Sequence, residues 1–106
     1  MEPIKVYAIR QISTGWFMPA TAPQRHRQRG YTRDEPTERC VPRLFLQRKY
    51  AKLALRAWLK GAWIETHAPG DYHGQLEPTG MEIVPVEGRK SEDMEIVQLI
   101  IVEAAT

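Results

Sequence analysis

The segment "QRKYAKLALRAWLKGAW" at 47–63 constrains the fold most, because its apolar residues recur with the spacing of an amphipathic helix. The predicted core-facing residues are Tyr50, Leu53, Ala54, Ala57 and Trp58. Alanine, leucine, lysine and arginine are all good helix formers. Gly61 follows Lys60 in the position of a glycine that ends a helix. No Ser, Thr, Asp or Asn caps the start, which we place near 46–48.

Strand patterns flank this helix on both sides. "IKVYAIRQISTGWFMP" at 4–19 alternates in its first half, which predicts a β-hairpin with its turn at Ser13-Thr14-Gly15 and its end at Pro19. A short strand is expected at 43–45. The string "MEIV" occurs at 81–84 and again at 94–97, with the polar turn "GRKSED" in between. We expect the second of these strands to be central in the sheet, since it is the more apolar, and the first to be an edge strand because Pro85 follows.

Two stretches carry loop signals. Residues 20–43 contain three prolines, and a structureless loop of this length is often functional. Residues 64–80, which include "ETHAPGDYHGQLEPTG", mix proline, glycine, aspartate and histidine and also predict a loop. The 106 residues are enough for one domain. The order ββ-α-ββ predicts a single α+β domain, with a small, mostly antiparallel sheet and one amphipathic helix packed on one face.

Charge is distributed unevenly along the chain. Residues 25–60 hold eleven Lys/Arg against three Asp/Glu, a net charge of +8, whereas residues 65–106 hold two against nine, a net charge of −7. Such asymmetry indicates either an electrostatic partner or pairing between the two halves of the chain. The sequence leaves both alternatives open.

The basic residues form the one candidate binding surface. In the loop "PQRHRQRGYTR" at 23–33, four arginines can meet phosphates or acidic side chains and a tyrosine can stack. The helix adds Arg48 and Lys49 and a stripe at intervals of four. Trp63, just past the helix, can anchor a partner. The candidate partner-binding residues are Arg25, Arg27, Arg29, Tyr31, Arg33, Lys52, Arg56, Lys60 and Trp63. The competing interpretation is a solvated helix face beside a charged loop.

Catalytic and metal-binding motifs are missing. Glu65, His67, Asp71 and His73 are ligand types, but their spacing matches no metal motif. Cys40 has no local motif of a nucleophile, so we expect an inert thiol. The sequence therefore predicts no enzyme, no cofactor and no metal site.

Cysteine usage and hydropathy bear on the compartment. A single cysteine allows no internal disulfide, which favours a reducing, cytoplasmic setting. The longest apolar run, "IVQLIIV" at 96–102, is far shorter than a membrane span. The start, "MEPIKVYAIR", lacks the layout of a secretory signal.

Three blocks resemble small uncharacterised proteins encoded in tailed-phage and prophage genomes. They are "YAIRQISTGWFMP" (7–19), "PRLFLQRKYAKLALRAWLKGAW" (42–63) and "VEGRKSEDMEIVQLIIVE" (86–103), which cover about half of the chain. Shared features are the hairpin ending in "FMP", the "PRLF" run into a helix with "WLKG", and the "GRK.EDMEIV" close. The resemblance implies a phage origin, a host-cell cytoplasmic location and a phage-side role.

Three functional hypotheses follow. The first is a non-catalytic accessory protein that binds a host protein or complex, for host takeover or for anti-defence such as an anti-CRISPR. The second is a small nucleic-acid-binding protein that uses the basic loop and the helix stripe. The third is a virion structural or assembly component that associates through an edge strand at 81–86.

Overall fold

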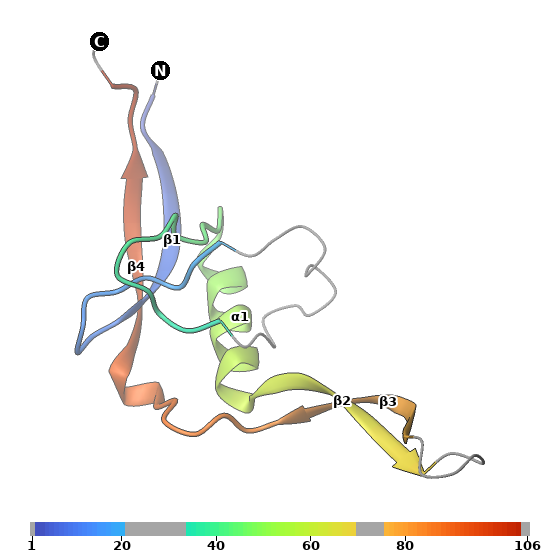
Figure 1. Ribbon diagram of the computed structural model, residues 1–106. Helices are drawn as coiled ribbons and strands as arrows, with labels where there is room; N and C mark the ends of the chain where they lie inside the picture. The colour runs from blue at the N-terminus through green and yellow to red at the C-terminus, as the bar shows by residue number, and fades with distance from the viewer. Residues whose placement is uncertain (1, 21–33, 70–75, 105–106) are drawn as a thin grey trace.

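The computed structural model describes residues 2–20, 34–69 and 76–104, and for part of the 62–84 region it describes the backbone alone. Its elements, drawn in Figure 1, are β1 (Ile4–Gln11), α1 (Arg48–Lys60), β2 (Ala62–Pro69), β3 (Leu76–Val84), the short 3₁₀ helix η2 (Ser91–Asp93) and β4 (Met94–Ile101). The predicted α+β class is confirmed, and the predicted ββ-α-ββ order holds approximately.

The first and last strands form the central ribbon. β1 and β4 pair antiparallel, from Ile4 opposite Ile101 to Gln11 opposite Met94. Because side chains alternate along a strand, Ile9, Ile96 and Met94 share one face, and this face packs against α1. The core forms only when both ends of the chain meet. Among the described residues β4 has a single strand neighbour, so the expectation that it is central in a sheet is wrong.

The predicted hairpin at 4–19 forms only in part. The chain turns after β1, with Gly15 at a φ of 75°, and Gln11 N–H donates to the Trp16 carbonyl over 2.8 Å. The returning segment then meets β1 through an isolated bridge at Phe17 rather than as a full strand. The expected strand at 43–45 is likewise a single bridge, in which Tyr7 and Phe45 exchange two backbone hydrogen bonds of 2.8 Å.

Over residues 64–69 and 76–80 a second ribbon replaces the predicted loop, whereas residues 70–75 of that loop lie outside the described residues. β2 and β3 pair antiparallel from Ala62 opposite Val84, with a register shift between Thr66 and His67. Pro78 lies opposite His67, beside this irregularity. A bulge leaves some ladder positions unpaired, so a proline that donates no hydrogen bond is tolerated there. Pro69, Pro78 and Gly80, which signalled a loop, therefore lie in an irregular, two-stranded ribbon.

The helix matches its predicted bounds, but its buried face is rotated. α1 buries Ala51, Ala54, Ala57 and Trp58. Tyr50 and Leu53, which the periodicity assigned to the core, are 49% and 55% exposed. Alanines let the helix backbone approach the ribbon closely, and Trp58 fills the space at the end of the contact.

One arginine, Arg89, links the segment between β3 and β4 to α1. The Arg89 side chain is only 2% exposed and forms a 2.9 Å ion pair with Glu35. Its guanidinium also donates to the Trp58 carbonyl over 2.8 Å and lies 4.3 Å from the centre of the Trp58 ring. The Trp58 indole donates in turn to the Asp34 carbonyl over 2.8 Å. Three segments that are distant in sequence thus meet at a single side chain.

The molecule is elongated. Its extents are 64 × 29 × 25 Å and its radius of gyration is 17.5 Å, whereas a compact chain of this length has about 13 Å. In Figure 1 the end of the β1–β4 ribbon that carries the termini extends beyond α1, and the β2–β3 ribbon extends in another direction. Among the described residues, no further layer covers the projecting part of either ribbon.

Gly61 is required by a close backbone approach, beyond its role as the helix end. Its φ is 143°, and a Cβ at this position would lie 1.9 Å from the Val84 carbonyl oxygen. We expect Gly61→Ala to lower the free energy of unfolding by about 3 kcal/mol, measured by urea denaturation. Gly15→Ala is the control, because nothing lies within 4 Å of its Cβ position and only the positive φ opposes the change, at about 1 kcal/mol. Equal losses for the two variants would contradict the close approach.

Arg89→Lys tests the buried arginine. Lysine keeps the charge but loses the planar fork and the stacking on Trp58, so we expect a loss of about 2–4 kcal/mol in the free energy of unfolding. The matched control is Arg10→Lys, whose 2.6 Å pair with Glu95 is more than one-third exposed; there we expect less than about 1 kcal/mol. Similar losses of unfolding free energy at both positions would show that the Arg89–Glu35 pair contributes no more than a surface ion pair.

Candidate functional site

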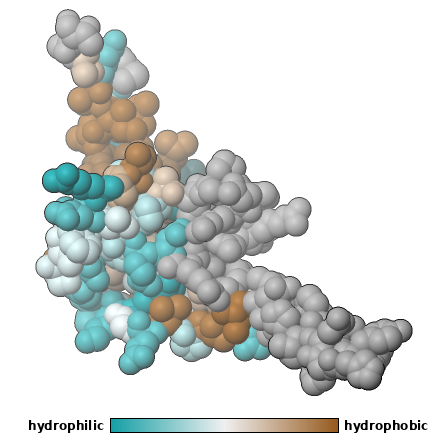
Figure 2. Space-filling model, viewed as in Figure 1, coloured by the Kyte–Doolittle hydropathy of each residue, from teal (hydrophilic) through white to brown (hydrophobic). Residues whose placement is uncertain are grey.

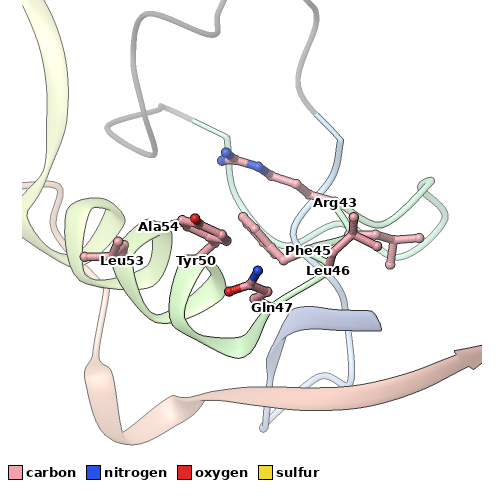
Figure 3. A pocket seen from close by; sticks show the side chains of 8 residues that line it. Arg43, Phe45, Leu46, Gln47, Tyr50, Leu53 and Ala54 are labelled. Atoms are coloured by element: carbon pink, nitrogen blue, oxygen red, sulfur yellow. The ribbon is translucent and has the colours of Figure 1, made fainter. Parts of the chain in front are cut away.

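A groove lies where the chain enters α1. It has a volume of about 500 Å³, and its lining residues are Arg43, Leu44, Phe45, Leu46, Gln47, Tyr50, Leu53 and Ala54. Figure 3 shows the Phe45 and Tyr50 rings turned toward each other, with Leu53 further along the helix. The bridge between Phe45 and Tyr7 attaches this entry segment to the outer edge of β1. The groove is therefore held on the β1 side of the central ribbon.

The groove continues onto the exposed side of α1. Leu53 is exposed, and on a helix its neighbours are the residues three and four positions away. These include Lys49 and Tyr50 before it and Arg56 after it, all of which are exposed. A large apolar side chain thus lies among cations, with no part of the described chain covering it. We refer to Lys49, Tyr50, Leu53 and Arg56 as the basic–apolar face.

Further positive charge surrounds this face. Lys52 and Lys60 are exposed on the same helix, and α1 contains no acidic residue. Arg48 lies 5.6 Å from the Tyr7 ring and Lys49 lies 5.1 Å from the Tyr50 ring, so both cations rest against aromatic groups. Positive charge therefore extends along the exposed side of the helix.

In the described part of the chain, acidic residues leave the charge of Lys52, Arg56 and Lys60 unpaired. Within the described ranges, Lys52, Arg56 and Lys60 form no ion pair. Ion pairs within the described ranges include Arg10–Glu95 and Arg89–Glu35. Among the described residues, pairing between the two halves of the chain therefore does not neutralise these three cations.

Arg43 adds a half-buried cation to the groove. Its guanidinium lies 4.8 Å from the centre of the Phe45 ring. Burial lowers the pKa of Arg43, and the charge of Asp34 opposes this effect. Arginine nonetheless stays protonated in proteins, so Arg43 contributes a fixed positive charge.

The candidate residues named from the sequence fall into three groups. Lys52, Arg56 and Lys60 lie together on the exposed side of α1, as expected. Trp63 lies in β2, where its backbone is opposite Ile83. The candidates that fall outside the described residues are Arg25, Arg27, Arg29, Tyr31 and Arg33.

Sequence reasoning missed the apolar part of the site. Leu44 and Leu46 were left out, and Tyr50 and Leu53 were assigned to the core, yet all four are exposed. A signal was present in the alanines at 51, 54 and 57, whose spacing of three marks the side of closest packing. Because the alanines face the ribbon, Tyr50 and Leu53 lie beside the buried face of the helix and remain exposed.

No catalytic arrangement is present among the described residues. The Cys40 thiol lies 3.5 Å from the Phe17 carbonyl and 3.6 Å from the Thr37 carbonyl, as a weak donor. The described residues contain no group of three potential metal ligands. Glu65 and His67 lie in β2, and Asp71 and His73 fall outside the described residues.

Comparisons with known proteins indicate neither a family nor a fold relative. No protein-family model, curated protein or solved structure matches this chain. The described part of the chain contains no helix with the length and apolar character needed to cross a membrane.

Truncating the basic–apolar face should cost little stability. We expect Tyr50→Ala and Leu53→Ala to change the free energy of unfolding by less than about 1 kcal/mol each, because both side chains are half exposed. Trp58→Ala should cost about 3–5 kcal/mol, since Trp58 is buried. Chemical denaturation followed by circular dichroism measures all three. A loss at Leu53 comparable to that at Trp58 would place Leu53 in the core after all.

Proposed function

We propose that this chain is a non-catalytic binding protein of phage type that docks on a host protein or complex through the basic–apolar face. The observation that carries the proposal is the exposure of Tyr50 and Leu53 among Lys49, Arg56 and Lys60. Neighbouring exposed apolar side chains that are rimmed by polar residues mark protein interaction sites. Cations around such a group favour a partner surface with an apolar centre and an acidic rim.

The face has the composition of a protein interface. Interface centres are enriched in aromatic and other apolar anchors, and their rims are polar and solvent-accessible. Here the tyrosine and leucine occupy the centre, and the groove beside them offers a recess for a partner side chain. Arg43, stacked on Phe45, lies at the wall of that recess. Anchors that meet pockets are where binding energy concentrates.

The sign of the charge favours occlusion over mimicry. A protein that imitates nucleic acid has to present negative charge, whereas α1 presents only positive charge. The chain would therefore cover an acidic surface of its target. Host takeover or anti-defence activity, such as an anti-CRISPR, needs no more than this, and the three phage-like sequence blocks support such a role in the host cytoplasm.

Nucleic-acid binding is the second candidate. It is favoured by Lys52, Arg56 and Lys60, which lack ion-pair partners within the described ranges and can each neutralise a phosphate. It leaves Tyr50 and Leu53 unexplained, because protein–DNA interfaces are more polar than protein–protein interfaces. For this reason we place it second.

Capture from a bacterial host lysate with charge-reversed variants tests the proposal. The immobilised chain should retain a stoichiometric host protein. Leu53→Glu combined with Arg56→Glu should weaken its retention at least about tenfold, equivalent to about 1.4 kcal/mol. Lys90→Glu is the matched control, since Lys90 is exposed and lies outside α1. Retention unaffected by the double variant would refute docking through this face.

A mobility-shift titration with duplex DNA and single-stranded RNA separates the second candidate. A shift at low salt that falls steeply with added salt and disappears in Arg56→Glu would favour nucleic-acid binding. No shift at low salt would leave protein docking as the function of the face.

A further inference from the structure

We propose that two copies of this chain associate through the outer edge of β4, with the strands antiparallel about a two-fold axis. The two ribbons would then form one continuous four-stranded sheet, in the order β1-β4-β4-β1. The association uses a surface different from the basic–apolar face, so it stands independently of the function proposed above.

The outer edge of β4 has the properties of a pairing edge. In the described part of the chain, β4 pairs with β1 alone, so its other side presents unpaired backbone donors and acceptors. The run "IVQLIIV" at 96–102 contains no charge, no proline and no glycine. Proteins normally protect exposed edges with charges, prolines or bulges, and a long apolar edge without them associates with another strand.

The opposite edge of the ribbon is already engaged. Tyr7 of β1 exchanges backbone hydrogen bonds with Phe45, and Met18 N–H donates to the Ile9 carbonyl over 2.9 Å. The entry segment of the helix and the groove therefore occupy the β1 side. β4 is left as the side on which the sheet can grow.

A second copy fits this edge better than a strand of different chemistry. In an antiparallel two-fold pair centred on Leu99, the neutral residues 96–102 face one another, and Glu95 of one copy faces Glu103 of the other. Glu95, the one charged residue of β4, is held by Arg10 through hydrogen bonds of 2.6 and 2.8 Å on its own ribbon. Antiparallel strands, moreover, need no connection between the chains to pair.

Apolar side chains at the end of the ribbon add contact area. Ile100 and Val102 are 58% and 62% exposed, and Ile4 and Ile101 are also exposed. Figure 2 shows the resulting apolar surface over the upper part of the β1–β4 ribbon, away from the teal surface of the body. A two-stranded ribbon is only marginally stable alone in water, and three or more strands with an apolar face are needed for independent stability.

The exposed area of the whole chain is large for its mass and leaves room for a subunit contact. The chain exposes 8010 Å², whereas a compact monomer of 12.2 kDa exposes about 6,100 Å². The excess of about 1,900 Å² falls within the roughly 1,000–2,500 Å² that each partner buries in an obligate dimer. The elongated shape, with its two projecting ribbons, contributes to this excess.

Light scattering after size exclusion tests the dimer with a designed variant. We expect the full chain at micromolar concentration to have twice the 12.2 kDa mass of one copy. Ile100→Glu is chosen because Ile100 lies opposite Lys5, so the new carboxylate gains a cross-strand partner in the monomer. In the dimer it introduces a charge into an apolar contact. Combined with Val102→Glu it should yield a monomer with an unchanged circular dichroism spectrum.

The control is Val41→Glu, which changes an equally apolar residue, 75% exposed and outside the ribbon, and should remain a dimer. A monomeric parent chain at high micromolar concentration would overturn the proposal, and so would a double variant that stays dimeric. Hydrogen exchange on the parent chain gives a test that needs no variant. Amides in 96–102 should exchange more slowly as the concentration rises, and exchange independent of concentration would also overturn the proposal.

Discussion

The arrangement of α1 and the two ribbons depends on the contacts of the buried Arg89 guanidinium. This group contacts Glu35 and Trp58 at once, and the Trp58 indole extends the network to the Asp34 carbonyl. A buried ion pair adds little net stability compared with apolar packing, because desolvation offsets the attraction. What it supplies here is a defined geometry: the flat group fits the Trp58 ring on one side and carbonyl and carboxylate oxygens at its edge.

This need for defined geometry follows from how small the core is. None of the buried side chains among the described residues is both large and fully buried, and several core residues are alanines. The β1–β4 pair closes only when the two ends of the chain meet, so the entropy of a long closure opposes it. Close packing of alanines recovers contact area in a narrow stripe, and this leaves Tyr50 and Leu53 outside it.

The helix bounds and the strands around both "MEIV" strings were predictable, because periodicity and end signals are local properties. The β2–β3 ribbon was not, because prolines and glycines at an irregular register have the same composition as a loop. The buried face of the helix was predicted wrongly for a different reason. Hydrophobicity ranks leucine and tyrosine above alanine, whereas close approach of the helix to the ribbon favours alanine. Likewise Gly61 was correctly placed at the helix end, but its contact with Val84 is visible only once the fold is known.

The two surfaces proposed for this chain reinforce each other because they lie on opposite edges of one ribbon. The groove and the basic–apolar face adjoin β1 through Phe45, and the self-pairing edge belongs to β4. A two-fold dimer would therefore present two such faces on a rigid sheet. When a target complex offers repeated acidic surfaces, binding of the second face becomes intramolecular, which raises the overall affinity without any new contact. A small chain with a modest interface would thereby hold a much larger assembly.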